Sequence, residues 1–400
     1  MTRGHTDVDD DAVNAWIHDD PDPTTRAELT ELLAAARSHG EQAAVAQAAL
    51  SDAFSGTLAF GTAGLRGRLG GGPNRMNRVV VIRAAAGLSA YLKERLGKGF
   101  SVVIGYDARH NSEQFARDTA AVVTGAGGRA ILFESYCPTP VLAFALRHLE
   151  ADAGVMVTAS HNPPQDNGYK VYLGGRAVTD SGQGAQIVPP YDTQIAAAID
   201  AVGPVESVPR PQAGWETVDP AVQEEYIERT AQVARMKAPT SVRIVLTAMH
   251  GVGGATCREV LARVGFTDVV EVAEQFEPDP DFPTVTFPNP EEPGALDLAL
   301  AKAREVEADL VIANDPDADR CSAAIPDGDS PGGWRQLTGD EVGALLGEQA
   351  AELAAFAGNG VLACSVVSSR LLRRIAQSHG LGFRRTLTGF KWISREPGLV

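Results

Sequence analysis

The chain has 400 residues, a length that ordinarily holds two or three domains. Apolar residues make up 44% and charged residues 22%, as in an ordinary globular chain. The formal net charge of −16 argues against nucleic acid or an anionic membrane surface as a partner, because both would repel the chain.

The N-terminus and the cysteines predict a compartment. Residues 1–20 include an acidic stretch and lack the apolar run of a signal peptide, and nowhere does the chain offer the roughly 20 apolar residues of a transmembrane helix. Cys137, Cys257, Cys321 and Cys364 are widely spaced, without the close pairs typical of zinc sites. We therefore expect free thiols in a reducing cytoplasm. Composition leaves the oligomeric state open.

The first elements in chain order are short helices and a loop. Leu29, Leu32 and Leu33 recur at helical spacing within the first 55 residues, which predicts helices packed on the rest of the protein. The glycine-rich stretch 61–73 is predicted to be irregular. Buried-strand patterns then alternate with helices. The helices are predicted at 77–96, 112–124 and 140–149, and the strands at 101–107, 129–133 and 153–158.

A polar stretch rich in proline and glycine, 189–220, is predicted to end the first α/β unit. In the second unit we predict helices at 221–235, 255–264 and 291–306, and strands at 242–248, 268–272 and 309–313. A third unit begins near residue 325, with helices at 338–353 and 369–379 and strands at 360–367 and 383–387. The fold class is therefore α/β with largely parallel sheets, whose strand-end loops ordinarily carry the functional sites. The predicted domains are 1–55, 56–205, 206–325 and 326–400.

Ser160 lies in such a loop, directly after a predicted buried strand. The loop reads Thr158-Ala-Ser-His-Asn-Pro163, so His161 follows the serine at once, and Lys170 comes ten residues later. A serine in this place can act as a nucleophile, although the G-x-S-x-G motif of hydrolases is absent. Taken alone, a Ser-His pair in a loop is more often an ordinary polar turn.

Three aspartates follow another predicted strand. Asp315, Asp317 and Asp319 stand at alternate positions, where their mutual repulsion is unfavourable unless a cation lies among them. Ligands that offer only oxygen suit Mg²⁺. A solvated acidic turn is the alternative. Arg320, which comes next, can pair with a carboxylate or reach a phosphate.

Two glycine-containing loops add weaker signals. Thr388, Gly389 and Lys391 stand together near the end of the chain, where the glycine permits close approach and the lysine supplies a cation. Arg66 lies in the stretch Gly61-Thr-Ala-Gly-Leu-Arg-Gly67, which is typical of a phosphate or sugar loop.

Together the loops resemble the α-D-phosphohexomutase superfamily of phosphoglucomutases, phosphomannomutases and relatives. Thr158–Pro163 resembles the family's active serine loop, Asp315–Arg320 its metal loop and Gly389–Ile393 its sugar loop. Gly61–Gly67 and Asp166–Tyr172 are most similar to the branch that includes phosphoglucomutase-2 and phosphopentomutase. The resemblance runs from about residue 50 to residue 400, and it implies consecutive phosphohexomutase-type α/β domains with mixed, largely parallel sheets.

The resemblance also implies a role for each candidate residue. Ser160 would be carried as phosphoserine, and its phosphate would complete the coordination of Mg²⁺. The remaining roles are metal binding by Asp315, Asp317 and Asp319, contact with the transferring phosphoryl group by Arg66 and Arg320, proton handling by His161 and Lys170, and sugar binding by Thr388, Gly389 and Lys391.

The implied activity is transfer of a phosphoryl group between the 1- and 6-positions of a hexose phosphate, with glucose as the first candidate. Hexose 1,6-bisphosphate would be the intermediate and activator. Mannose or pentose phosphate are alternative substrates.

A different class is a truncated chain that only binds Mg²⁺ and phosphosugar. The family adds a Glu-Glu sugar loop and a fourth domain with an Arg-Ser-Gly-Thr loop, neither of which occurs at the end of this chain. We accordingly expect an incomplete third domain with an unpaired sheet edge and exposed apolar surface. A serine hydrolase is disfavoured, because it would leave the aspartate loop unexplained.

Overall fold

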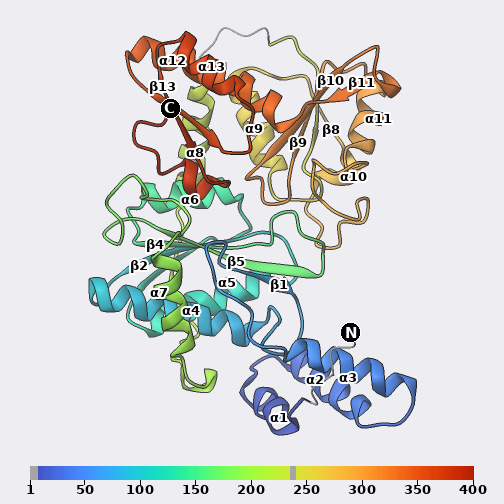
Figure 1. Cartoon of the computed structure of the whole chain (residues 1–400), viewed down its shortest axis with the longest axis vertical. Coiled ribbons are helices and arrows are strands. Elements are labelled where there is room, and N and C mark those ends of the chain that lie inside the picture. Colours follow the sequence, from blue (N-terminus) through green and yellow to red (C-terminus); the bar gives the residue numbers. More distant parts are fainter. Residues whose placement is uncertain (1–7, 235–239) are drawn as a thin grey trace.

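The computed structural model describes residues 8–234 and 240–400. Three N-terminal helices lie at one end of the molecule, the first α/β unit lies in the middle, and the other two units lie at the far end (Figure 1). The N-terminal helices are α1 (Asp10–Asp19), α2 (Pro23–Ala36) and α3 (Glu41–Ala53), which confirms the predicted helical segment. Asp22 caps α2 by accepting a hydrogen bond from Thr24 N, and Pro23 supplies a preset first turn.

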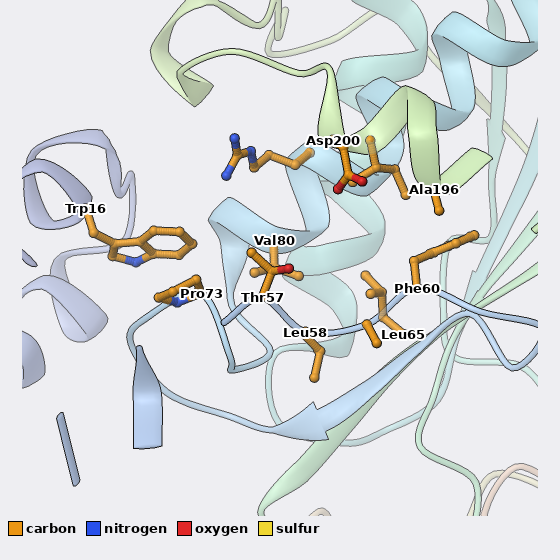
Figure 2. A pocket seen from close by; sticks show the side chains of 12 residues that line it. Trp16, Thr57, Leu58, Phe60, Leu65, Pro73, Val80, Ala196 and Asp200 are labelled. Atoms are coloured by element: carbon orange, nitrogen blue, oxygen red, sulfur yellow. The ribbon is translucent and has the colours of Figure 1, made fainter. Parts of the chain in front are cut away.

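The N-terminal helices pack on the first α/β unit. The Asp19 carboxylate accepts hydrogen bonds from the backbone N–H groups of Val205 at 2.9 Å and Glu206 at 3.1 Å. Trp16 and Phe60 lie on opposite sides of an apolar cavity of about 350 Å³ between these helices and the first unit (Figure 2). The helical segment is therefore docked on the body of the protein, as predicted.

The first unit contains a mixed, six-stranded sheet with strand order β1-β5-β4-β2-β3-β6. The strands are β1 (Leu65–Arg68), β2 (Ser101–Tyr106), β3 (Arg129–Leu132), β4 (Ala153–Val157), β5 (Asp166–Leu173) and β6 (Glu216–Thr217). Strands β2, β3, β4 and β6 are parallel, whereas β5 is antiparallel to β1 and β4. The prediction of an irregular loop across 61–73 was wrong at β1, because pairing with β5 gives this glycine-rich segment a strand conformation.

Helices cover both faces of this sheet. Val102 and Ile104 pack with α4 (Arg78–Leu96) and α5 (Ser112–Gly125), while the alternate residue Val103 packs with α6 (Thr139–His148). The stretch predicted to separate two units contains a further helix, α7 (Tyr191–Asp200), which packs on α4. The backbone of Ile199 lies so close to Gly87 that a side chain there would collide with it. The helix was missed because its partner is far away in the sequence.

Gly64→Ala is expected to destabilise the pairing of β1 with β5. Gly64 has φ +73°, and a Cβ atom there would lie 1.8 Å from the carbonyl oxygen of Tyr169 in β5. We expect the free energy of unfolding in urea to fall by about 3 kcal/mol. Gly127→Ala is the control, because Gly127 has φ +85° and open space around it, so only the backbone cost of about 1 kcal/mol applies. Equal losses in the two variants would contradict the steric explanation.

The second unit contains a five-stranded sheet with order β11-β10-β9-β7-β8. The strands are β7 (Ile244–Thr247), β8 (Val269–Glu271), β9 (Leu310–Asn314), β10 (Cys321–Pro326) and β11 (Trp334–Gln336), and the helices are α8 (Ala221–Val233), α9 (Gly254–Val264), α10 (Ala273–Phe276) and α11 (Asp297–Glu305). The helix predicted over 291–306 begins only at Asp297, because Gly294 has φ +84°. The predicted end of α8, at residue 235, lies outside the described residues.

Both sheets extend past the predicted ends of their domains. Strand β6 joins the first sheet beyond residue 205, and β11 joins the second beyond residue 325. Each is a short edge strand, so neither has an apolar pattern that marks it in the sequence. The predicted boundaries therefore cut off an edge strand from each sheet.

The third unit has a parallel pair of strands, β12 (Val361–Ser365) and β13 (Gly382–Thr386), with helices α12 (Gly339–Ala357), α13 (Leu371–Ser378) and α14 (Phe390–Ile393). Large apolar side chains are exposed on it, including Leu345, Val367 and Phe390. This exposure agrees with the expected apolar surface.

Two predictions concern membrane-spanning helices and the cysteines. None of the described helices is long and apolar enough to cross a bilayer. All four cysteines are free thiols, as predicted.

Candidate functional site

The serine loop and the aspartate loop meet although they come from different sheets. The first follows β4 and the second follows β9, so each leaves the C-terminal end of a parallel strand. Ser160 Oγ donates a hydrogen bond to Asp315 Oδ2 at 2.9 Å. Residues 155 positions apart are thereby placed in one buried contact.

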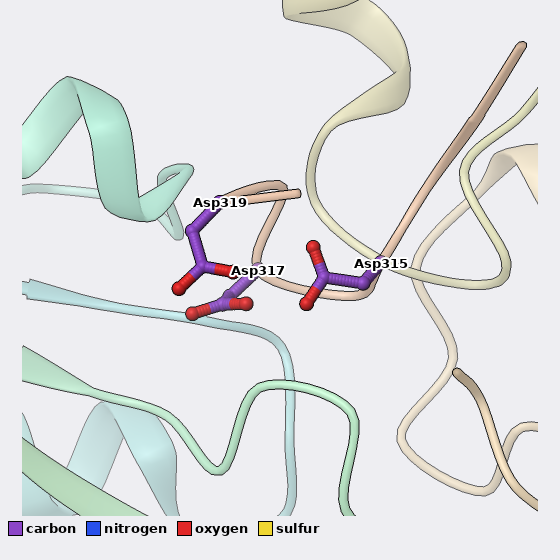
Figure 3. Close-up of side chains that lie close together, drawn as sticks. All are labelled: Asp315, Asp317 and Asp319. Atoms are coloured by element: carbon purple, nitrogen blue, oxygen red, sulfur yellow. The ribbon is translucent and has the colours of Figure 1, made fainter. Parts of the chain in front are cut away.

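The three aspartates form a compact group of carboxylates (Figure 3). One oxygen from each of Asp315, Asp317 and Asp319 lies within 4.8 Å of the others. Asp315 and Asp317 are fully buried, which excludes the alternative of a solvated acidic turn. Burial, and then the charges of Asp317 and Asp319, raise the pKa of Asp315 well above its ordinary value.

The donor set fits a hard divalent cation. Asp317 Oδ1 and Asp319 Oδ1 are buried and accept no hydrogen bond, although Arg320 Nε lies 3.6 Å from Asp319 Oδ1, so both oxygens retain acceptor capacity for an ion. Three carboxylates without nitrogen or sulfur ligands suit Mg²⁺. The residues present therefore fit the predicted cation.

Lys170 and Thr139 support the triad from the first unit. Lys170 Nζ, on β5, donates to Asp317 Oδ2 at 2.7 Å and to Asp319 Oδ2 at 2.9 Å. Burial opposes the charge on Lys170, but these two carboxylates outweigh it and raise the pKa of the ammonium above its ordinary value. Thr139 Oγ1, at the start of α6, donates to Asp317 Oδ2 at 2.7 Å. Lys170 is therefore a protonated donor here.

Thr139→Val is expected to weaken binding of Mg²⁺ or Mn²⁺ about tenfold, because the hydrogen bond that orients Asp317 is lost. The affinity is measured by Mn²⁺ titration. Thr119→Val is the matched control, since it removes another buried hydroxyl, bonded to the carbonyl oxygen of Phe115 in α5. A similar loss of affinity in both variants would contradict the specific role of Thr139.

Cationic groups surround the serine. Arg320 donates through Nη2 to Asp315 Oδ2 at 3.0 Å and to His161 Nδ1. Burial, followed by the charges of Arg320 and Arg66, lowers the pKa of His161 to about 4. The imidazole is therefore neutral at neutral pH, and because arginine can only donate, Nδ1 accepts and Nε2 carries the proton. Ser160 Oγ lies 3.2 Å from this Nδ1.

Arg66 approaches the same loop from β1. Its Nη1 donates to Asn162 Oδ1 at 3.2 Å, while its Nε is buried and without a partner. The serine, the neutral histidine and the two arginines thus form a locally basic place in an acidic chain. Anionic groups are expected to be attracted to such a place.

Of the predicted sugar-binding residues, Lys391 bonds the glycine-rich loop 61–67, which also carries Arg66. Lys391 Nζ donates to Thr62 Oγ1 at 2.8 Å, Gly389 precedes α14 with φ +117°, and Thr388 is exposed. Within residues 8–234 and 240–400, no hydrogen bond or ion pair joins any of the three to the aspartate triad. The loop of the third unit that carries Lys391 therefore contacts the glycine-rich loop 61–67 of the first unit.

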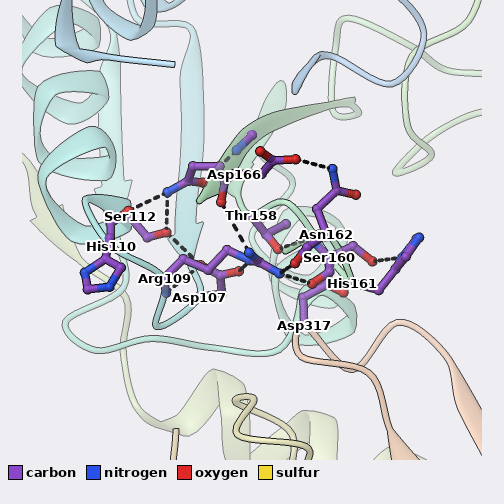
Figure 4. A network of polar contacts seen from close by, with 12 residues as sticks. Asp107, Arg109, His110, Ser112, Thr158, Ser160, His161, Asn162, Asp166 and Asp317 are labelled. Carbon is purple, nitrogen blue, oxygen red and sulfur yellow. Dashed lines mark hydrogen bonds and ion pairs between the residues drawn. The ribbon is translucent and has the colours of Figure 1, made fainter. Parts of the chain in front are cut away.

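Sequence reasoning missed Arg109 and Thr139. Arg109 follows β2, is buried and contacts the serine loop (Figure 4). A signal was present, because the charged pair Asp107 and Arg109 comes directly after an apolar strand at the sheet edge that carries the serine loop. Thr139 gave no comparable signal in the sequence.

Consecutive α/β domains that together present a serine, a carboxylate triad and arginines define a class of multidomain α/β proteins. Three models described as phosphoglucomutase/phosphomannomutase α/β/α domains I, II and III match residues 57–203, 224–328 and 338–396. The chain belongs to the phosphoglucomutase/phosphomannomutase family. This confirms the predicted fold class of consecutive family domains with mixed sheets.

Named relatives agree on the family and differ in their sugars. The chain is 49% identical over 328 residues to a Haemophilus influenzae protein named "Probable phosphomannomutase", covering 81% of this chain and 65% of the relative. It is 37% identical over 426 residues to the phosphoribomutase of Saccharomyces cerevisiae, covering 98% of this chain and 65% of the relative. Staphylococcal relatives are named phosphoglucomutase. The chain thus spans somewhat less than two thirds of the length of these relatives.

A solved structure supports the same fold. A Thermus thermophilus structure described as a "putative phosphomannomutase" superposes with a TM-score of 0.65 at 29% identity, covering 84% of this chain and 70% of that one.

Proposed function

We propose that this chain acts as a phosphosugar mutase that transfers a phosphoryl group between the 1- and 6-positions of a hexose phosphate through Ser160. The observation that carries the proposal is the contact of Ser160 Oγ with Asp315, at the edge of a buried carboxylate triad and beside Arg320. A serine hydroxyl bonded to a potential metal ligand is suited to carry a phosphoryl group. Without a bound cation, three adjacent buried carboxylates are costly to keep charged, and the raised pKa of Asp315 reflects this cost.

The residues around Ser160 are suited to this transfer. In the first half-reaction the bond from phosphorus to Ser160 Oγ breaks and a bond to a sugar hydroxyl oxygen forms. The hydroxyl proton passes through a proton-handling group, and the net result is a proton on Ser160 Oγ. The second half-reaction reverses these changes at the other end of the hexose 1,6-bisphosphate. Arg66 and Arg320 would donate hydrogen bonds to the phosphoryl oxygens, where negative charge develops. Mg²⁺, held by Asp315, Asp317 and Asp319, would neutralise part of that charge when bound.

His161 and Lys170 are the two groups proposed to handle the proton of the sugar hydroxyl, and their contacts suggest how each would act. His161 Nδ1 lies 3.2 Å from Ser160 Oγ and accepts a hydrogen bond from Arg320, so it would take a proton only when Arg320 donates to the phosphoryl group instead. Lys170 is bonded to Asp317 and Asp319, so it would hand on a proton only when one of these bonds is released.

Glucose phosphate is our first candidate substrate, with mannose and pentose phosphates as alternatives that the relatives' names keep open. Thr388, Gly389 and Lys391 are proposed to bind the sugar. A chain that binds Mg²⁺ and phosphosugar without turnover is the second candidate function. It is favoured by the hydrogen bond from Lys391 to Thr62, which engages the ammonium proposed to bind the sugar.

The test is incubation with isotopically labelled glucose 1,6-bisphosphate and Mg²⁺, followed by mass spectrometry of the labelled peptide. We expect the phosphate on Ser160 and then turnover of glucose 1-phosphate. Rates with mannose 1-phosphate and ribose 1-phosphate rank the sugars. Label on Ser160 without turnover would support the binding function, and absence of label would overturn the mutase proposal.

We also propose limits for the domains and a cellular compartment for the protein. We keep the proposed limit at 55, and keeping each edge strand with its sheet moves the proposed limit at 205 to about residue 220 and that at 325 to about residue 337. We place the protein in the cytoplasm, where its four thiols would remain reduced.

A further inference from the structure

One buried guanidinium holds the backbone of the serine loop. Arg109 is only 4% exposed, and Figure 4 shows it beside the loop that carries Ser160. Its hydrogen bonds go to backbone carbonyl oxygens. Nη2 donates to Ser160 at 2.7 Å and to Asn162 at 2.6 Å, and Nη1 donates to Pro163 at 2.8 Å and to Asp166 at 3.2 Å.

The position of Arg109 is itself determined by a buried carboxylate. Asp107 Oδ2 lies 3.3 Å from Arg109 Nε, and both side chains are about 1% exposed. Asp107 Oδ1 accepts further bonds from Ser112 Oγ at 2.6 Å and from Arg109 N at 3.1 Å. Ser112 Oγ in turn accepts a bond from Asn167 Nδ2 at 3.0 Å. Asp107 therefore supplies the opposite charge for the Arg109 guanidinium and helps to fix its position beside the loop.

The serine loop needs such support because its central residue has an unfavourable backbone conformation. Ser160 has φ +54°, a left-handed value that costs a residue with a side chain about 1 kcal/mol or more. Its N–H donates to Thr158 Oγ1 at 2.8 Å, and its carbonyl oxygen accepts from Arg109. In this conformation Ser160 Oγ lies 2.9 Å from Asp315 Oδ2.

We propose that Arg109 is a positioning residue for phosphoryl transfer at Ser160. It contacts no atom of Ser160 other than the backbone, and it acts by holding the loop in the one conformation that directs Oγ toward the aspartate triad. A planar guanidinium can bond four carbonyl oxygens at once, whereas an ammonium of the same charge lacks the fork geometry. The role in transfer rests on the proposed function, while the role in ordering the loop does not.

The test compares Arg109→Lys with Arg78→Lys. Arg78 forms a two-bond pair with Asp118 at 2.7 and 2.8 Å between α4 and α5, so its replacement removes a similar fork away from the serine loop. Two quantities are measured: the rate of phosphate uptake by Ser160 from glucose 1,6-bisphosphate, and amide hydrogen exchange in residues 158–168. For Arg109→Lys we expect uptake about 100-fold slower. We also expect exchange about tenfold faster in that segment only. Arg78→Lys should change neither.

A second variant separates positioning from folding. Arg109→Ala is measured with and without methylguanidinium, which can occupy the vacated position, and we expect added methylguanidinium to restore at least about tenfold in the uptake rate. Mn²⁺ affinity should stay at the wild-type value in each variant, because the hydrogen bonds that Arg109 donates go to the serine loop and Asp107 and not to the aspartates, Lys170 or Thr139. Wild-type uptake by Arg109→Lys would overturn the positioning role. If the wild-type protein takes up no phosphate, the mutase proposal fails, and amide hydrogen exchange alone then tests the role of Arg109 in ordering the loop. Unchanged exchange of residues 158–168 in Arg109→Lys would overturn that role.

Discussion

Ser160→Ala is expected to lower phosphate uptake from glucose 1,6-bisphosphate by more than about 10³-fold, since it removes the oxygen that would carry the phosphoryl group. Ser160 Oγ is the serine hydroxyl bonded to Asp315 among the residues that the structure describes. The measurement is the stoichiometry and rate of labelling by intact mass. Mn²⁺ affinity of the unphosphorylated protein should be nearly unchanged, since all three aspartates remain.

Ser89→Ala is the matched control for this experiment. Ser89 is also a buried serine, and its Oγ has no hydrogen-bond partner, so its removal should leave both uptake and stability near the wild-type values. Labelling of Ser160→Ala at the wild-type rate would place the phosphate on another group and overturn the assignment of Ser160.

Lys170→Met should give the largest loss of stability. Lys170 is buried and bonded to Asp317 and Asp319, so its removal leaves two buried carboxylates beside Asp315 without their positive partner. Without divalent cation, we expect the free energy of unfolding to fall by about 3–5 kcal/mol. Urea unfolding in EDTA measures this loss. Saturating Mg²⁺ should restore more stability to the variant than to the wild type, because the cation then supplies the missing positive charge.

Lys302→Met provides the comparison for Lys170→Met. Lys302 pairs with Glu305 on the exposed side of α11, where solvent screens the ion pair and it contributes little to stability. Its stability should be close to that of the wild type with and without Mg²⁺. If Mg²⁺ stabilised Lys170→Met no more than it stabilises Lys302→Met, the triad would not be the cation site.

Elements with a strong local pattern were predictable. Strand β4 has five consecutive buried residues, and α4 begins after Asn77, whose side chain accepts a hydrogen bond from Val80 N. Elements that depend on a distant partner were not. Strands β1, β6 and β11 are short edge strands, and α7 occurs within a proline-rich stretch because it packs on α4.

The candidate site divides in the same way. Ser160, Asp315, Asp317 and Asp319 could be selected from the sequence because each motif is contiguous and follows an apolar strand. Lys170 could be selected only through the family resemblance, and its bonds to two aspartates were not foreseen. Lys170 lies on β5, and the pairing of β5 with β4, the strand before the serine loop, brings Lys170 to the aspartates.

The amino-acid sequence by itself determined the α/β alternation, the residue types of the two loops and their order, because these depend on neighbours along the chain. The tertiary structure decided which loops meet. It joined Ser160 to Asp315, placed Lys391 on Thr62, and gave Arg109 its partners in the serine loop. Those contacts span from 51 to 329 positions, so they depend on how the sheets and domains pack and leave no local pattern in the sequence.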